Sequence, residues 1–537
     1  MKKILLLIII LGGFLRFYGV NWDSYGAYHP DERNISWAVT RIRFFDQMNP
    51  KFFAYGGLPI YVYRALGEGV VAITHNPQWL SDWGRIAVVG RYVSATLSTI
   101  SILLIYLVGA AYFSPEVGIL SAALIAISPW AFQQAHFDTT ETMLVFFLLM
   151  MTLIGRQLFH KLTYPNVLLL GVVWGLAMAA KTTGVLFGII PLSAIWFGHD
   201  PKKFTKKILS TFLLGAIAAL VFFCFSPYTL IDLTHFRESM TYESGVALGR
   251  FTVPYTLQFF HTAPYLYQIE TMLWQAGPLV IVGLIGLLVL IIYNLRSTVS
   301  FLIFPILYFG WVGSWFAKFN RYNVPFLPFA TIAAAWFMMT TLKKIPKKSF
   351  YWFIGVLVYW SIGLFTVWWG LANFSVYLRP QTRLTATEWI YTHIPAGAKI
   401  YTEHWNDGLP LDVQNGILYH RELLTVYDQD NAAKKIYYAD KLAAGDFIIL
   451  STRRIWATMP ELGEKYPLTK LFYRRLLNGT LGYTEAATFT SYPQRFGVTV
   501  NDDYAEESLQ VFDHPTVRIF QNTEHFTRAQ LLNLLTP

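Results

Sequence analysis

Residues 1–32 read MKKILLLIIILGGFLRFYGVNWDSYGAYHPDE, and this stretch decides the class of fold. Its apolar segment, from Ile4 to about Val20, follows two lysines and runs on without a small-x-small cleavage site, which predicts a retained membrane anchor. The positive-inside rule places the amino end in the cytoplasm and carries the next acids, Asp31 and Glu32, to the outer face. Two carboxylates beside the outer membrane surface indicate chemistry there.

The composition of the whole chain is typical of a multispanning membrane protein. Hydrophobic residues make up 54% of the sequence and charged residues only 14%, with a mean hydropathy of +0.40, whereas an ordinary soluble domain carries about 25% charged residues. The net charge of +10 comes mainly from Lys and Arg clusters between apolar segments. Such clusters set topology and argue against nucleic acid as a partner. The single cysteine, Cys224, excludes an intramolecular disulfide.

About eleven membrane-spanning helices are expected from a window of roughly 20 residues. They lie near 4–20, 86–112, 117–131, 142–155, 167–183, 184–198, 208–226, 275–293, 299–316, 325–341 and 350–372. We therefore predict an α-helical polytopic domain over 1–372 in the cell membrane, with outer loops at 21–85 and 227–274. An aromatic stretch in the second loop, 254–261, indicates an interfacial segment that either covers a lipid substrate or is purely structural.

Residues 373–537 have a different character, with charges of both signs, ordinary apolar periodicity and turn residues. The length, about 160 residues, is enough for one globular domain. Segments 398–402, 446–451 and 516–520 are predicted strands, and 385–388 resembles a capping box that opens a short helix. We expect a soluble α/β or α+β domain on the extracytoplasmic side.

The acidic pair at the first outer loop is the first candidate for catalysis. His29 and Pro30 stiffen the approach to Asp31 and Glu32, and Pro30 presets the backbone. A carboxylate there can accept the proton of an attacking hydroxyl as a general base. The alternative is a pair of solvated loop acids without a role.

A second acidic turn, HFDTTE at 136–141, follows the third predicted span. Asp138 and Glu141 have the spacing of helix capping, which is one interpretation, and a role toward substrate is the other. Two acidic loops on one outer face can also bind a divalent ion or share general-base work. The sequence decides neither, so a metal remains possible and no cofactor is certain.

Basic residues at the outer ends of spans are the expected complement to these acids. They are Arg16, Lys181, Lys318 and Arg321, the last followed by Tyr322. Positive-inside bias opposes such positions, so they require another reason. Snorkelling or pairing with the acids is one, and binding of a lipid-linked phosphate by Arg and Lys is the other.

Together these motifs resemble the polytopic GT-C glycosyltransferases of the protein O-mannosyltransferase and aminoarabinose-transferase superfamily. The resemblance covers roughly 1–375 and implies a GT-C helical core that passes a sugar, with inversion, from a polyprenyl-phosphate carrier to an acceptor on the outer face. It implies Asp31 as catalytic base, Glu32 as its partner and Asp138 as the second-loop acid. His29, Glu141 and the basic residues with Tyr322 are then expected to bind substrate, while a protein, lipid or glycan acceptor stays open.

The carboxy-terminal domain carries a further resemblance, to prokaryotic phospholipid-carrier-dependent glycosyltransferases. Residues 403–410, EHWNDGLP, are similar to their motif after the first strand of the outer domain, with Asn406 in place of a more usual acid.

Two other classes of function compete with an enzyme. A transporter or flippase for a lipid-linked saccharide, with an outer sensing domain, requires ionisable residues along a path through the bilayer, whereas the charges here lie near the ends of spans. A purely structural assembly protein requires that the acidic loops be dispensable.

Overall fold

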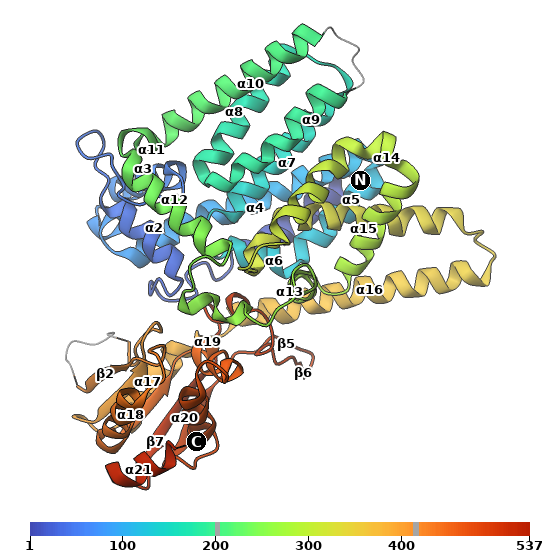
Figure 1. Ribbon diagram of the computed structural model, residues 1–537. Coiled ribbons are helices and arrows are strands. Elements are labelled where there is room, and N and C mark those ends of the chain that lie inside the picture. Colours follow the sequence, from blue (N-terminus) through green and yellow to red (C-terminus); the bar gives the residue numbers. More distant parts are fainter. Residues whose placement is uncertain (199–203, 412–417, 537) are drawn as a thin grey trace. The chain divides into compact units, whose positions relative to one another are not determined.

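The computed structural model describes residues 1–198, 204–411 and 418–536, and the chain divides into two compact units (Figure 1). The first contains Met1–Phe251 and Ala263–Phe374, and the second contains Thr252–Thr262 and Ser375–Pro537. The division differs from the expected boundaries because Thr252–Thr262 joins the second unit. Leu257 lies in that unit's core, and the Gln258 side chain donates to Glu506 at 3.0 Å.

The first unit is helical throughout its regular structure. Its α-helices are α1 (Lys2–Phe17), α2 (Pro30–Thr40), α3 (Gly57–Thr74), α4 (Trp83–Tyr112), α5 (Pro115–Ile127), α6 (Pro129–Ala135), α7 (Glu141–His160), α8 (Tyr164–Ala180), α9 (Ile189–Phe197), α10 (Phe204–Phe225), α11 (Tyr228–Ile231), α12 (Leu233–Ala247), α13 (Leu266–Ala276), α14 (Leu279–Val312), α15 (Leu327–Lys344) and α16 (Phe350–Phe374).

Membrane-spanning length is reached by fewer helices than the sequence predicts. Among the described residues, four helical segments are long and apolar enough to cross a membrane: α4, α7, α10 and the segment beginning at Phe350 that contains α16. The count is five if α5 and α6, bent by 58° at the Ser128–Pro129 step, form one span. The expected eleven spans are not confirmed, because several are short apolar helices. Two of them, 275–293 and 299–316, correspond to the apolar stretches Leu279–Tyr293 and Thr298–Val312 of α14.

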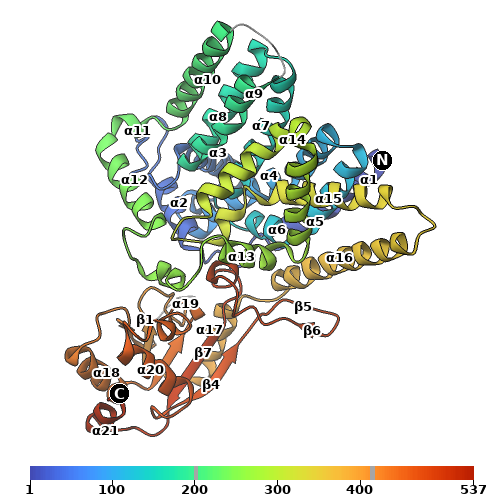
Figure 2. The same ribbon diagram turned by 45° about the vertical axis from the view of Figure 1, so that its right-hand side comes forward.

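Small residues let the helices of the first unit approach closely. Helix α8 packs against α10, as Figure 2 shows, and Gly171 and Gly175 of α8 lie in this contact. A Cβ added at Gly175 would come within 2.6 Å of the carbonyl oxygen of Ala218 on α10. Glycines spaced by four residues therefore bring the two backbones together, which is the usual way in which apolar helices gain packing energy in lipid.

The second unit combines helices with a mixed sheet. Its elements are α17 (Thr382–His393), β1 (Lys399–Glu403), β2 (His420–Leu424), α18 (Ala432–Ala444), β3 (Phe447–Leu450), α19 (Arg453–Trp456), α20 (Pro467–Leu477), β4 (Tyr483–Phe489), β5 (Gln494–Arg495), β6 (Val498–Thr499), β7 (Val517–Asn522) and α21 (Arg528–Leu534). In the described residues, five strands pair in the order β2-β1-β3-β7-β4, with β1 parallel to β2 and β3, and β7 antiparallel to β3 and β4.

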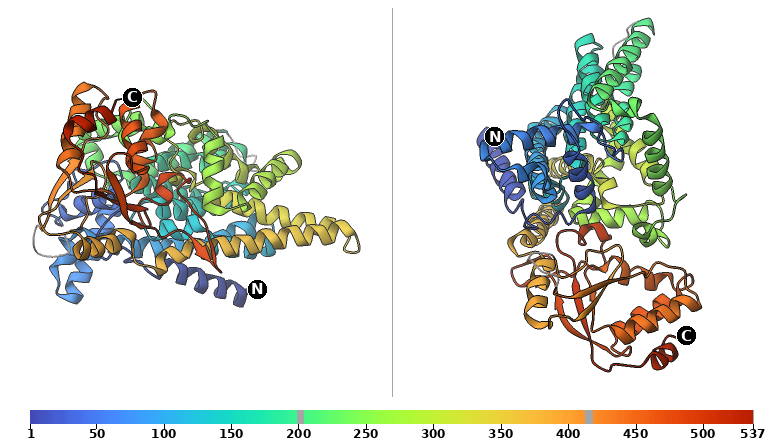
Figure 3. Two further views of the ribbon diagram at one scale, coloured as in Figure 1. Left: turned by 90° about the horizontal axis from the view of Figure 1, so that it is seen from below. Right: turned by 90° about the vertical axis from the view of Figure 1, so that its left-hand side faces the viewer.

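Both faces of this sheet are covered by helices (Figure 3, right view). Alternate residues of β3 point to opposite faces: Ile449 packs with Ile390 of α17, whereas Ile448 packs in the cluster that holds Tyr438 of α18 and Phe472 of α20. The period of two in a strand explains why β3 is buried along its whole length. The predicted strands are therefore present, but α17 begins at Thr382, before the expected capping box, because Gln381 caps it.

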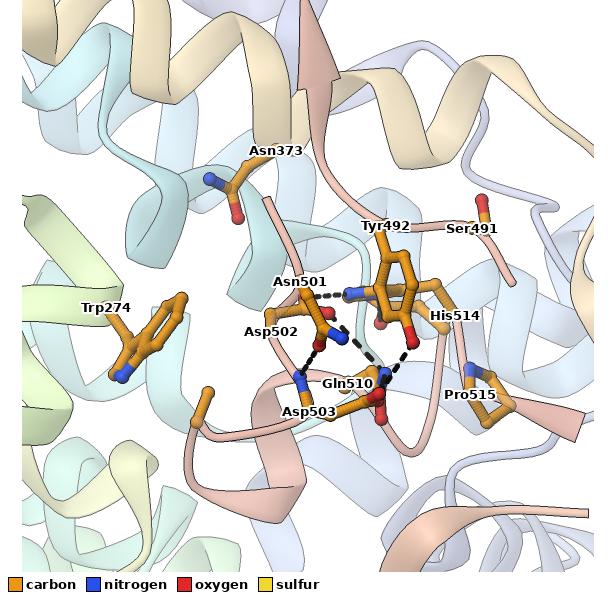
Figure 4. A network of polar contacts seen from close by, with 12 residues as sticks. Trp274, Asn373, Ser491, Tyr492, Asn501, Asp502, Asp503, Gln510, His514 and Pro515 are labelled. Atoms are coloured by element: carbon orange, nitrogen blue, oxygen red, sulfur yellow. Dashed lines mark hydrogen bonds and ion pairs between the residues drawn. The ribbon is translucent and has the colours of Figure 1, made fainter. Parts of the chain in front are cut away.

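A buried charge network joins the loops beside β7 (Figure 4). The His514 ring bonds Asp513 through Nδ1 at 2.5 Å and Asp502 through Nε2 at 2.7 Å. Burial alone would lower the pKa of His514, but the two carboxylates raise it to about 10, so the ring is a cation at neutral pH. The neighbouring Asp503 accepts hydrogen bonds from Gln510 and from the Tyr492 hydroxyl.

Candidate active site

The start of helix α2 positions Asp31. His29 caps the helix by accepting the Asp31 backbone N–H at 3.2 Å through Nδ1, and Pro30 occupies the first helical turn. Burial lowers the pKa of His29 to about 4, which keeps its ring neutral and able to accept. The His29 ring also packs on Phe137 of the second acidic turn, with centroids 4.9 Å apart. The cap at His29 therefore fixes the position of Asp31 at the start of α2.

Asp31 forms an ion pair with Arg321 from the loop before α15. The side chain of Asp31 remains 22% exposed, so the pair lies at an accessible surface of the first unit. Burial opposes ionisation of Asp31, but neighbouring groups, led by the Arg321 cation and including the Tyr55 hydroxyl, hold the pKa of this carboxyl below its usual value. Asp31 is consequently a carboxylate at neutral pH.

Glu32 occupies a different environment from its neighbour. Its side chain is fully buried, and its two oxygens accept from the Arg91 guanidinium of α4 at 2.8 and 2.6 Å. The same guanidinium binds both oxygens of Asp23 at 2.8 and 2.7 Å and the carbonyl oxygen of Val20 at 3.2 Å. Arg91 therefore ties the segment after α1, the start of α2 and helix α4 at one point.

The second acidic turn is attached to this network through its backbone. The Asp138 N–H donates to Glu32 Oε1 at 2.6 Å, which places the two acidic motifs side by side as the sequence suggested they could be. Neither carboxylate oxygen of Asp138 has a hydrogen-bond partner in bonding geometry among the described residues, although the Tyr63 hydroxyl lies within electrostatic range. Burial, with a contribution from the negative charge of Glu32, raises the pKa of Asp138 well above its usual value.

Helix α4 makes room for Asp138 with a glycine. A Cβ added at Gly90 would lie 1.9 Å from Oδ1 of Asp138, so only glycine fits beside this carboxyl. The fully buried side chain thus lies against the α4 backbone rather than capping α7 from solvent. The sequence also allowed Asp138 to cap α7. The structure does not show that contact, because no side chain caps α7.

Glu141 and Lys181 form a second ion pair, with Nζ to Oε1 at 2.8 Å. Oε2 of the buried Glu141 has no partner among the described residues, and the Lys181 ammonium lies 5.0 Å from the centroid of the Tyr55 ring. Because Tyr55 also bonds Asp31, this pair and the Asp31–Arg321 pair share a neighbour. Glu243 of α12 lies within electrostatic range of Arg321, Asp31 and Lys181.

Three of the predicted site residues have other contacts. Arg16 is fully buried and donates to Ser98 and to main-chain carbonyls at the end of α5, so it holds helices together. Lys318 donates to the Phe316 carbonyl of its own loop at 2.8 Å, and burial lowers its pKa. Tyr322 lies beside Arg321, and its backbone carbonyl accepts the Tyr308 hydroxyl.

Sequence reasoning missed five residues of this region: Asp23, Tyr55, Tyr63, Arg91 and Glu243. Arg91 carried a signal, because an arginine inside an apolar span needs a buried partner. The other four lie in loops or in helices within the predicted outer loops, where nothing in the sequence marks them as neighbours of Asp31.

The described residues contain no group of three or more His, Cys, Asp and Glu side chains arranged to hold a metal ion. The acids instead pair with Arg91, Arg321 and Lys181.

Comparison with known proteins finds one family match and several structures of similar fold. Residues 83–230 match the family model of dolichyl-phosphate-mannose-protein mannosyltransferases. The Archaeoglobus fulgidus oligosaccharyltransferase is structurally similar, with a TM-score of 0.55 at 14% identity, over 93% of this chain and 75% of that one. The chain has the GT-C fold. The family match and the fold agree in the kind of protein to which they point.

Two further structures are similar to this GT-C chain. The same archaeal enzyme, in complex with an inhibitory peptide and a dolichol-phosphate, gives a TM-score of 0.56 at 13% identity over 93% and 75% of the two chains. ArnT from Cupriavidus metallidurans, bound to undecaprenyl phosphate, gives 0.47 at 14% identity over 72% of each chain. None of the curated proteins matches the chain by sequence.

The first prediction concerns Arg91. Replacing Arg91 by Ala leaves the buried carboxylates of Asp23 and Glu32 without a counter-charge, which should lower the free energy of unfolding by about 3–5 kcal/mol. Chemical unfolding in detergent micelles measures this. Lys51→Ala is the control, because it removes an exposed ion pair with Asp232 and should cost about 0–1 kcal/mol. Equal effects of both substitutions would show that the buried cluster is not a structural anchor.

Proposed function

We propose that the protein transfers a sugar, with inversion, from a polyprenyl-phosphate-linked donor to an acceptor on the extracytoplasmic face of the membrane. The observation that carries the proposal is the ionised, partly exposed carboxylate of Asp31 beside two cations, Arg321 and Lys181. A base and phosphate-binding groups are the two parts that this reaction needs. The archaeal relative that was solved with a dolichol-phosphate supports a lipid phosphate as donor carrier. The structure of the same enzyme with a tethered acceptor peptide supports a protein among the acceptor kinds.

The chemical step needs only one base. The acceptor oxygen attacks the anomeric carbon from the face opposite the phosphate, its proton passes to Asp31, and the bond from the anomeric carbon to the phosphate oxygen breaks. The phosphate leaves with the electron pair and is stabilised by the guanidinium of Arg321 and the ammonium of Lys181. Since attack and departure are on opposite faces, the configuration at the anomeric carbon is inverted.

The Asp31–Arg321 pair also couples donor binding to basicity. In the free protein, Arg321 lowers the pKa of Asp31, which makes the carboxylate a weak base. A donor phosphate bound to Arg321 draws part of the positive charge away from Asp31 and so raises its proton affinity. The base is strengthened only when the leaving group is in place.

The remaining acids have supporting roles in this proposal. Glu32 positions the start of α2 by bonding Arg91, and its contact with the Asp138 N–H fixes the second acidic turn. Burial favours the protonated form of Asp138, which can donate a hydrogen bond toward a bound sugar or to Tyr63. Glu141 holds Lys181 in place.

Asp31→Asn is the direct test of the base. Transfer from a polyprenyl-phosphate sugar should fall by on the order of 10²–10⁴-fold, because the amide cannot accept the proton. Single-turnover assays with saturating donor measure the rate, and donor binding should persist. Glu68→Gln, which changes an acid on the surface of α3, is the control and should be active. Undiminished transfer by the Asp31 variant would contradict the assignment.

The phosphate contact is tested by a matched pair of substitutions in one loop. Arg321→Ala should weaken binding of polyprenyl phosphate about tenfold or more, because a charge-assisted contact is lost. Lys318→Ala is the control, since that ammonium bonds its own loop. Titration of the detergent-solubilised protein gives both affinities. If Lys318→Ala weakens binding and Arg321→Ala leaves it unchanged, the phosphate lies elsewhere.

The extracytoplasmic position of the second unit is tested by labelling. With Cys224 replaced by Ser, a Thr480→Cys substitution places a thiol on an exposed turn of that unit. An impermeant maleimide should react with it in intact cells. A reaction that occurs only after the membrane is opened would reverse the proposed topology.

A further inference from the structure

A short β-hairpin leaves the body of the second unit between β4 and β7 (Figure 2). Strands β5 and β6 pair antiparallel, Gln494 with Thr499 and Arg495 with Val498, and Phe496 and Gly497 form the turn. The side chain of Phe496 is 77% exposed and that of Val498 is 52% exposed. Two apolar side chains therefore stand in solvent at the tip of a protruding element.

The turn is built at a cost in backbone energy. Phe496 and Gly497 have φ angles of 52° and 79°, the left-handed values of a two-residue type I′ turn, in which Asn-Gly is the usual choice. A bulky residue such as Phe is strained there. A strained and exposed aromatic residue is explained if it gains an apolar environment that the isolated chain does not provide.

The base of the hairpin is attached to the residues that follow helix α16. The Gln494 N–H donates to Ser375 Oγ at 3.1 Å, and the Arg379 guanidinium donates to the carbonyls of Ser491 and Tyr492 at 3.0 and 2.6 Å. Ser375 is the residue directly after Phe374, where α16 ends. The Tyr492 hydroxyl bonds Asp503 at 2.6 Å, so the strand leading into the hairpin is also held by the charge network of Figure 4.

The helix α16 is long and apolar enough to cross a membrane. This apolar helix has 25 residues, which corresponds to a length of roughly 37 Å and exceeds the roughly 30 Å of the hydrocarbon core. Gln494, at the base of the hairpin, is bonded to Ser375, the residue after α16. With α16 across the membrane, Phe496 is therefore only a few residues away from the lipid headgroups.

We propose that the hairpin Gln494–Thr499 is a membrane anchor of the second unit, with Phe496 and Val498 inserted in the interfacial region of the bilayer. Arg495 is exposed beside the tip, 4.8 Å from the Phe496 ring centroid. With the Phe496 ring inserted, its guanidinium lies at the depth of the lipid phosphates and can bind them. Two side chains offer too little area for a stable protein interface, which buries about 800 Å² per partner, but suit shallow insertion. The proposal rests on α16 as a membrane helix and is independent of the proposed chemistry.

Spin labelling of the full-length chain tests the anchor. In a Cys224→Ser background, a nitroxide is attached after Phe496→Cys or Val498→Cys, and the protein is reconstituted in vesicles of phosphatidylethanolamine and phosphatidylglycerol. Oxygen concentrates in lipid and a nickel chelate in water, so the oxygen-to-nickel collision ratio should be on the order of tenfold higher than at Leu423→Cys. Leu423 is the matched control because it is an apolar residue, 50% exposed, on β2 at the opposite edge of the sheet from β4.

Each outcome decides the proposal. A ratio at both hairpin positions equal to that at the control means that the tip is in water and overturns it. A label shielded from both reagents means that the hairpin packs against protein, which also overturns it. Insertion at Val498→Cys alone still supports the anchor, because Phe496→Cys removes the anchoring ring itself. Arg495→Glu should lower the ratio at Val498→Cys in these anionic vesicles through repulsion, and Asp31→Asn should leave it unchanged.

Discussion

The buried guanidinium of Arg91 is the interaction on which the site depends. An isolated charge inside a helix bundle is very costly, so Arg91 is stable there only with both Asp23 and Glu32 as counter-ions. Each carboxylate comes from a different segment, and Glu32 further binds the backbone of the second acidic turn. Because Arg91 needs these counter-ions, it brings the segment after α1, the start of α2 and the turn before α7 together on helix α4.

Adjacent acids serve different purposes because their environments differ. Asp31 and Glu32 follow each other on the first turn of α2, yet one side chain is partly exposed and the other is fully enclosed. Successive helical residues point about 100° apart, so anchoring Glu32 in the interior turns Asp31 toward the surface and toward Arg321. The buried ion pairs of Arg91 fix the geometry, and the Asp31–Arg321 pair stays partly exposed.

The second unit also combines a buried core with an exposed element, the hairpin of β5 and β6. Its sheet is covered on both faces, and the Asp502–His514–Asp513 charges lock the loops beside β7. Against this rigid frame, the strained Phe496 turn stands out as an element whose conformation the unit itself does not explain.

The sequence alone predicted the helical membrane class and a carboxy-terminal α/β domain with three of its strands, since composition and periodicity are local properties. It also singled out Asp31, Glu32 and Asp138, whose roles stay predictions. It left the role of Arg16 open and did not find Arg91, to which Asp23 and Glu32 both bind, and its span count was not confirmed. Only the tertiary structure decides which charges meet: Arg321 reaches Asp31 across 290 positions, and the contact follows from helix packing. Pairing energy depends on distance and burial in space, and neither is encoded in the neighbours of a residue along the chain.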